Sequence, residues 1–100
     1  MRIEEKRKEI DEIDRSIVWL LNRRAAVVKD LSVLKRHAGL PVRDSGREDE
    51  VMRRLSDMNA GPMDCRAIAS IYRAIFEESR RLQSAAQCEA SGSNFNSLEQ

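Results

Sequence analysis

Apolar residues recur at heptad spacing through the first third of the chain. Between Ile3 and Ala38 the sequence contains neither glycine nor proline. One column of the repeat holds Ile3, Ile10, Ile17 and Leu31, and the next holds Ile13, Leu20, Val27 and Leu34. This pattern is typical of one long amphipathic helix with a coiled-coil-like apolar stripe. Gly39-Leu40-Pro41 predicts where that helix ends.

The predicted helix is too long for the core that one chain of this size can build. At about 1.5 Å per residue the helix measures roughly 50 Å. A compact chain of 100 residues has a radius of gyration of about 13 Å. The apolar stripe therefore extends beyond its own core and needs a second apolar surface. We expect a second copy of the chain to supply that surface, which predicts a homodimer.

A second, shorter helix is predicted from about Gly46 to about Asn59. Asp44 or Ser45 can accept hydrogen bonds from the free backbone N–H groups of its first turn. The residues of its inner face are Glu48, Val51, Met52, Leu55 and Met58. Glu48 has two interpretations, because Ser45 and Glu48 also stand at the spacing of a capping box that would close the helix end.

A third helix is predicted after Asp64, whose side chain suits an N-cap, and ends near Gln87. Its apolar face holds Ile68, Ile71, Tyr72, Ile75, Leu82 and Ala86. From Cys88 onward the chain is polar and has few apolar anchors. We therefore expect an all-α domain of three helices (long, short and medium) over residues 1–87, and a disordered tail or linker stump over residues 88–100.

Composition narrows the function classes. Lys and Arg total 18 and Asp and Glu total 17, so the net charge is +1, and 4% of the residues are aromatic. A dedicated nucleic-acid binder is usually more basic and richer in stacking aromatics. Neither a membrane span nor a signal peptide is expected, because the necessary apolar runs are missing. Cys65, Cys88 and His37 are too few for a zinc site or a disulfide framework. We expect a cytoplasmic protein without a metal.

The most informative positions are two cations that interrupt the apolar stripe of the long helix. Arg24 occupies one of the heptad columns, and Lys35, eleven residues later, faces the same way. Neither has a carboxylate one turn away on its own helix. An unpaired cation on a core face is costly unless an anion meets it. That anion is either a carboxylate of another helix or an anionic ligand. Arg23 falls outside the columns, and we take it to be solvated.

Three further polar residues are candidates for a site. Ser79 and Gln83 stand one turn apart on the third helix, where such residues are often satisfied minor core groups. Arg7 has Glu4 and Asp11 at ion-pair spacing on its own helix. The sequence contains no glycine-rich phosphate loop and no evident nucleophile–base pair.

Together these residues resemble the all-helical chorismate mutase family. The matching segments are Arg7-Lys8-Glu9-Ile10-Asp11-Glu12-Ile13-Asp14, Leu20-Leu21-Asn22-Arg23-Arg24, Lys35, Pro41-Val42-Arg43-Asp44, Arg47-Glu48 and Ser79-Arg80-Arg81-Leu82-Gln83. They span about residues 5–83, and their order and spacing are more specific than any one segment. The resemblance implies an intertwined homodimer of three-helix chains. It also implies an enzyme of phenylalanine and tyrosine biosynthesis that converts chorismate to prephenate by a Claisen rearrangement without a cofactor.

The chemistry that the resemblance implies needs cations and hydrogen-bond donors. The protein must fold a flexible dianion into its reactive shape and stabilise charge as the ether C–O bond breaks. Arg24 would bind a substrate carboxylate, and Lys35 would contact a carboxylate and the ether oxygen. Gln83 would donate its amide N–H to the same oxygen. An amide donates without titrating, so we expect this position to cause no loss of activity between mildly acidic and neutral pH.

The resemblance implies substrate-binding roles for four further residues. Ser79 would hydrogen-bond the ring carboxylate, and Glu48, with help from around Asp44, would bind the ring hydroxyl. Arg7 would bind a carboxylate in the partner subunit's site. Arg7 and Arg24 are 17 residues apart, about 25 Å along a helix, so they cannot meet one small ligand within a chain. Antiparallel pairing of two long helices would bring them together.

Two other functions stay open at this point. The first is isochorismate pyruvate-lyase, a sibling activity on the same fold, although the segment from Pro41 to Glu48 is more similar to the mutase pattern. The second is a non-catalytic helical dimerisation module, which would be favoured if Arg24, Lys35 and Glu48 were all paired internally with no cavity between them. The sequence leaves open whether the chain stands alone or belongs to a fusion, and whether it is under feedback control.

Overall fold

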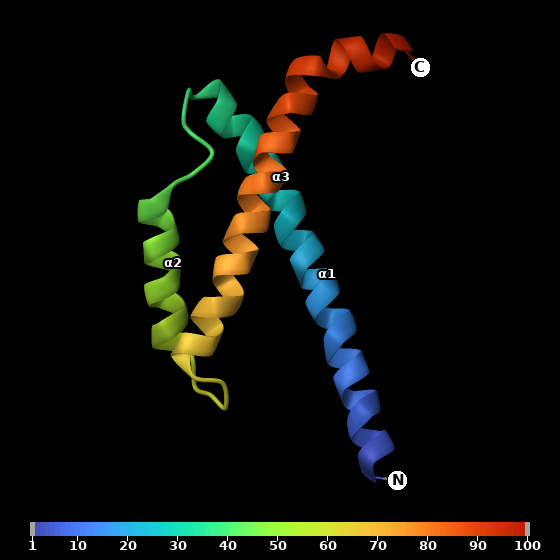
Figure 1. Cartoon of the computed structure of the whole chain (residues 1–100), viewed down its shortest axis with the longest axis vertical. Helices are drawn as coiled ribbons and strands as arrows, with labels where there is room; N and C mark the ends of the chain where they lie inside the picture. The colour runs from blue at the N-terminus through green and yellow to red at the C-terminus, as the bar shows by residue number, and fades with distance from the viewer. Residues whose placement is uncertain (1, 100) are drawn as a thin grey trace.

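Three α-helices make up the fold. The computed structural model describes the backbone of residues 2–99 and the side chains of residues 2–87. The helices are α1 (Arg2–His37), α2 (Ser45–Met58) and α3 (Cys65–Glu99). Both α1 and α2 pack on α3, which crosses α1 near the C-terminal end of α1 (Figure 1). The predicted all-α fold with a long first and a short second helix is confirmed. Within the described range, no helix combines the length and the apolar character needed to cross a membrane.

The C-terminal end of α1 follows the predicted turn chemistry. The Leu40 N–H donates to the Lys35 carbonyl (2.8 Å) and the Gly39 N–H donates to the Arg36 carbonyl (3.1 Å). This is a Schellman motif, and Gly39 adopts the φ of +69° that it requires, a conformation without steric cost only for glycine. The motif reverses the chain, so that Val42 lies back against Lys35.

Two aspartates cap the shorter helices, as the sequence predicts. Asp44 Oδ1 accepts a hydrogen bond from the Arg47 N–H at 2.9 Å, and Asp64 Oδ1 accepts one from the Ala67 N–H at 2.7 Å. Because Asp44 is the N-cap of α2, the alternative in which Ser45 caps this helix is wrong.

The inner face of α2 agrees with the prediction except at its end. Val51, Met52 and Leu55 are half-buried on the side that faces α3. Met58 is 72% exposed, because α2 ends there and the chain turns away at Asn59. The capping-box interpretation of Glu48 is also wrong, since its carboxylate reaches across to Arg80 of α3.

The third helix continues past the end that the sequence predicts. We expected an end near Gln87, but α3 extends to Glu99. Residues 88–99 contain no proline that would stop a helix. The side chains from Cys88 onward lie outside the described residues. The division into a domain over residues 1–87 and a tail over 88–100 therefore stays a prediction.

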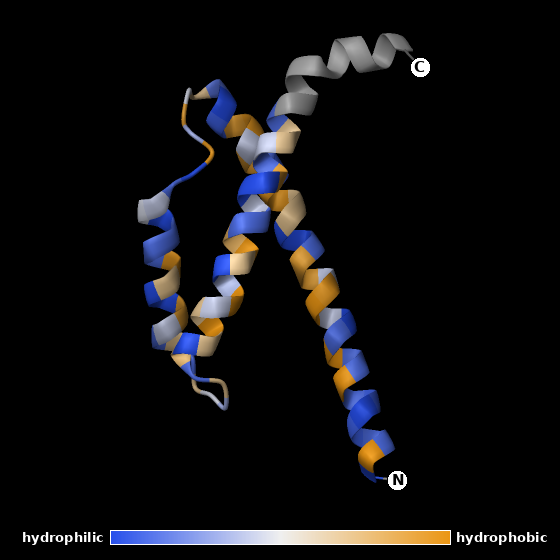
Figure 2. Ribbon diagram, in the orientation of Figure 1, coloured by the Kyte–Doolittle hydropathy of each residue, from blue (hydrophilic) through white to orange (hydrophobic). Residues whose placement is uncertain are grey.

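One chain buries very few of its apolar side chains. Among the described residues, Val28 and Phe76 are the buried apolar ones. Along α1, Ile13 is 57% exposed and Val27 is 65% exposed. The N-terminal half of α1 extends away from the other helices (Figure 1), and apolar positions run along it (Figure 2). The radius of gyration is 17.7 Å, against about 13 Å for a compact chain of this length.

Candidate active site

The site candidates gather around one cavity. This cavity has a volume of about 270 Å³ and is lined by residues of α1, of α3, of α2 and of the segment before α2. We call it the inner cavity. Six of the seven residues that the sequence singles out line it: Arg24, Lys35, Asp44, Glu48, Ser79 and Gln83. The seventh, Arg7, is not among the lining residues.

Arg24 is held at the wall of the inner cavity by neutral groups. Its Nη1 donates to Ser79 Oγ at 2.7 Å, and Ser79 in turn donates to the Ile75 carbonyl at 2.7 Å. The guanidinium carbon also lies 5.9 Å from the centroid of the Phe76 ring. These contacts fix the orientation of the guanidinium without cancelling its charge, so the cation is available to a ligand anion.

Lys35 is held in the same way from the opposite end of the cavity. Its Nζ donates to the Val42 carbonyl at 2.8 Å and to Gln83 Oε1 at 3.0 Å. An ammonium has three N–H groups, which leaves one for a ligand. Gln83 is only 5% exposed, and because its carbonyl oxygen accepts from Lys35, its amide nitrogen remains free to donate. The free N–H of Lys35 and the amide N–H of Gln83 are therefore two hydrogen-bond donors side by side in the inner cavity.

Glu48 has an internal partner that the sequence analysis did not identify. Arg80 Nη1 lies 2.5 Å from Glu48 Oε2, and the two side chains are 28% and 20% exposed. The pair joins α2 to α3 across 32 positions of the sequence. No local pattern signals such a pair, although Arg80 stands next to Ser79 in the segment that carries the resemblance. Arg47 is a second charged residue of the lining to which the sequence analysis gives no role.

The charged residues of the inner cavity do not balance. Four cations (Arg24, Lys35, Arg47 and Arg80) and two carboxylates (Asp44 and Glu48) line it, but Arg80 is paired with Glu48, and Arg47 is paired with Glu50 outside the lining. In the described part of the chain, neither Arg24 nor Lys35 forms an ion pair with a carboxylate. The alternative in which a carboxylate of another helix neutralises both is therefore wrong within the single chain. Arg24 and Lys35 are thus the two lining cations without a carboxylate partner in the described chain, and a ligand with two carboxylates could bind both.

Two arginines of α1 lie outside this cavity. Arg23 is exposed, as the sequence predicts; its guanidinium carbon lies 5.0 Å from the centroid of the Trp19 ring, and it does not line the site. Arg7 is 69% exposed at its side chain and pairs with Glu4 at 2.9 Å. Within one chain Arg7 therefore makes the ordinary surface ion pair that its spacing allows, and its role in a partner's site stays a prediction.

Known proteins match both the sequence and the fold of this chain. A chorismate mutase of Methanocaldococcus jannaschii is 30% identical over 83 residues, which cover 82% of this chain and 84% of that protein. A bifunctional chorismate mutase/prephenate dehydratase of Aquifex aeolicus is 38% identical over 77 residues, or 73% of this chain. The chain spans only 21% of the length of that bifunctional relative.

Solved structures agree with the sequence matches. Chorismate mutase (form II) of Thermus thermophilus superposes with a TM-score of 0.83 at 34% identity, covering 84% of this chain and 96% of that one. The Helicobacter pylori chorismate mutase, solved in complex with prephenate, superposes with a TM-score of 0.81 at 28% identity, covering 87% and 94%. Residues 6–84 match the family described as chorismate mutase type II. The resemblance seen in the sequence is thus confirmed, and the chain belongs to the chorismate mutase type II family.

Proposed function

We propose that this protein is a chorismate mutase, which converts chorismate to prephenate in the biosynthesis of phenylalanine and tyrosine. The observation that carries the proposal is the inner cavity, where Arg24 and Lys35 present fixed positive charge without a carboxylate partner in the described chain. Chorismate carries two carboxylates, which these two cations can bind. The matching family and the prephenate complex of the Helicobacter pylori relative support the same substrate.

The reaction needs geometry and electrostatics from the protein and no proton transfer. In the Claisen rearrangement the ether C–O bond breaks while a new C–C bond forms within the same molecule. Negative charge grows on the ether oxygen in the transition state, and donors that are already oriented stabilise it without reorganising. The free N–H of Lys35 and the amide N–H of Gln83 are the two donors that meet in the cavity. Arg24 binds a carboxylate and holds the folded conformer of the substrate.

The remaining residues of the inner cavity orient the substrate. Glu48 accepts a hydrogen bond from the ring hydroxyl, and Arg80 holds the Glu48 carboxylate in place through their ion pair. Asp44 lies beside it as the N-cap of α2, which leaves its second carboxylate oxygen for the same hydroxyl. Ser79 holds Arg24, and to reach the ring carboxylate its hydroxyl turns away from the Ile75 carbonyl.

The active assembly is a homodimer in which α1 pairs with its copy. Support comes from an apolar groove of about 760 Å³ between α1 and α3, whose lining includes Ile17, Leu21, Ile71 and Ile75. The exposed stripe of α1 is of the kind that would fill such a groove, and burying apolar surface is the main favourable term in association. Arg7 then reaches the partner subunit's inner cavity and adds a carboxylate ligand to it.

The test is an assay of the purified chain on two substrates. We expect loss of chorismate with stoichiometric formation of prephenate, and tight binding of a bicyclic dicarboxylate that mimics the transition state, measured by calorimetry. Release of pyruvate from isochorismate would instead establish the lyase. Turnover of neither substrate together with no binding of the mimic would leave a dimerisation module. Light scattering during gel filtration measures whether the mass is twice that of one chain. The expected cytoplasmic location stays a prediction.

A further inference from the structure

A second cavity, larger than the inner cavity, lies between α2 and α3. Its volume is about 640 Å³, and we call it the outer cavity. The lining residues come from α2, α3 and the segment before α2, and none comes from α1. Because the proposed dimer contact involves α1 and the groove between α1 and α3, pairing of two chains does not use this surface.

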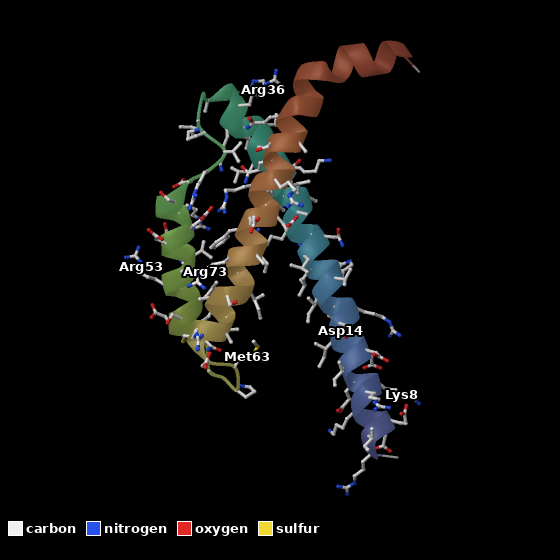
Figure 3. All side chains as sticks on the ribbon, viewed as in Figure 1. Lys8, Asp14, Arg36, Arg53, Met63 and Arg73 are labelled. Atoms are coloured by element: carbon white, nitrogen blue, oxygen red, sulfur yellow. The ribbon has the colours of Figure 1, made fainter. Side chains whose placement is uncertain are left out.

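The outer cavity is rich in arginine. Arg43, Arg66, Arg73 and Arg80 line it, against the two carboxylates of Glu48 and Asp49. Among the ion pairs of the described residues, only Arg80 of these four takes part. Figure 3 shows Arg73 in the space between α2 and α3, whereas Arg53 projects from the opposite side of α2. Unpaired guanidinium groups around a hollow favour a carboxylate or another oxyanion.

The rest of the lining is apolar and mostly half-buried. It consists of Met52, Leu55, Ile68, Ala69 and Phe76. Phe76 is 6% exposed and lies at the inner end. Apolar walls with a few convergent charged groups are the usual composition of a small-molecule site. A simple inorganic anion would leave these walls in contact with water, whereas an anion with a ring would cover them.

We propose that the outer cavity binds a second small ligand, an amphipathic monocarboxylate whose ring packs on the apolar walls while Arg66 and Arg73 bind its carboxylate. This site is separate from the substrate site of the inner cavity. Glu48, Phe76 and Arg80 line both cavities, so the ion pair of Glu48 with Arg80 is a shared wall.

The shared wall couples the two sites. The anion that Arg66 and Arg73 hold in the outer cavity attracts the nearby Arg80 guanidinium away from Glu48, and thereby weakens the ion pair that holds Glu48 in place. Since Glu48 is proposed to bind the substrate hydroxyl, occupation of the outer cavity raises the KM for chorismate. The coupling is reciprocal, so substrate weakens binding of the second ligand by the same factor. This coupling rests on the proposed function, whereas the binding site itself does not.

Cys65 provides a readout that needs no activity. Its thiol lines the outer cavity and accepts hydrogen bonds from Ser56 Oγ (3.4 Å) and Asn59 Nδ2 (3.7 Å). These hydrogen bonds, that from Ser56 first, lower the pKa of the Cys65 thiol below its usual value, and the thiolate is the form that reacts with iodoacetamide. In a Cys88→Ser chain, the rate of alkylation of Cys65 therefore reports the occupancy of the cavity.

The experiment follows this alkylation rate while 2-naphthoate is titrated as the probe. We expect saturable protection of Cys65, with the probe affinity lowered about tenfold by Arg66→Ala and by Arg73→Ala, because each removes a charge-assisted hydrogen bond. Arg53→Ala is the matched control and leaves the affinity unchanged. Lys35→Ala lowers kcat/KM for chorismate by about a hundredfold or more and leaves protection intact, which separates the two sites.

Three outcomes would overturn the proposal. These are absence of protection, equal protection in the two arginine variants and the parent, and loss of protection in Lys35→Ala, which would place the probe in the inner cavity. Circular dichroism confirms that each variant is folded. A KM for chorismate that does not change at saturating 2-naphthoate would overturn the coupling through Arg80. If the protein turned over no chorismate at all, the protection experiment would still decide the binding site.

Discussion

The two halves of α1 carry the same heptad pattern, but α3 crosses and covers one side of the C-terminal half (Figure 1). In the C-terminal half, α3 crosses the helix, so Val28 is only 9% exposed and Lys35 is half-buried. In the N-terminal half no other helix of the chain lies alongside, and Ile13 is 57% exposed (Figure 1). Contact with α3 buries only one side of the C-terminal half, because Val27 and Leu34 of the heptad columns are each 65% exposed there. The apolar stripe therefore lacks a partner surface along both halves of α1.

The cations of the two halves also differ in their partners. Arg24 and Lys35 are oriented by long-range partners, Ser79 and Gln83, and face a cavity. Among the described residues, Arg7 pairs with Glu4 alone, on the surface, and a pair of this kind contributes little to stability and holds its members loosely. A cation becomes a binding group when tertiary contacts orient it without neutralising it. Arg7 lacks such contacts in the single chain, which is why its proposed role depends on a second copy.

The largest effect is expected from removing the charge of Lys35, in the C-terminal half of α1 that α3 crosses. Lys35→Ala should lower kcat/KM for chorismate by about a hundredfold to a thousandfold, because it deletes a preorganised donor to the ether oxygen. Steady-state assays measure this, with the helical content from circular dichroism unchanged. Lys29→Ala, an exposed lysine of the same helix, is the control. Near-normal turnover of Lys35→Ala would remove this residue from the mechanism.

A charge placed on the apolar stripe in the N-terminal half of α1 tests whether this stripe is the contact between the two chains of the dimer. Ile13→Glu should weaken the dimer by about a hundredfold, because association would bury an unpaired carboxylate. Light scattering should then find the mass of one chain at concentrations where the parent has the mass of two. Arg15→Glu changes a position outside the apolar columns of α1 and serves as the control. If the Ile13→Glu chain kept the mass of a dimer, the stripe would not be the contact.

Replacing the amide of Gln83 by a carboxyl group, which titrates, makes the activity of the inner cavity depend on pH. Gln83→Glu should lower kcat/KM by about tenfold or more at neutral pH, because only a protonated carboxyl donates a hydrogen bond. Lys35, whose Nζ lies 3.0 Å from Gln83 Oε1, favours the ionised carboxylate, so activity should return only on acidification. The parent chain should show no fall between mildly acidic and neutral pH from this position, and a steep fall there would contradict the role of Gln83.

Mixing two inactive variants tests whether Arg7 of one chain and Lys35 of another act in the same site. The recovered activity is the smallest of the expected effects. Arg7→Ala and Lys35→Ala chains, unfolded together and refolded at equal amounts, should recover about a quarter of the parental activity, because half of the dimers are mixed and each holds one intact site. The same variants refolded separately are the controls. If Arg7 acts within its own chain, no intact site forms and the mixture stays as inactive as its components.

The sequence predicts most of the local structure, namely the helix ends and the N-caps. The end of α1 at Gly39 and the N-caps Asp44 and Asp64 were predicted because capping and turns depend on neighbours within a few positions. The C-terminal end of α3 was not, since the polar residues after Gln87 do not stop a helix as a proline would. The inward-facing cations Arg24 and Lys35 were also predicted, because they interrupt a periodic apolar stripe.

By itself, the sequence determined which residues are helical, which faces are apolar and which charges are out of place on those faces. The tertiary structure alone decided which side chains those charged groups contact. Arg24 could have met a carboxylate and meets Ser79 instead, 55 positions away, while Glu48 is joined to Arg80 across 32 positions. The physical reason is that periodicity acts over one or two helical turns, whereas partners across a cavity depend on how three helices cross. The pair of unpartnered cations that a dianion would bind exists only once the helices have packed.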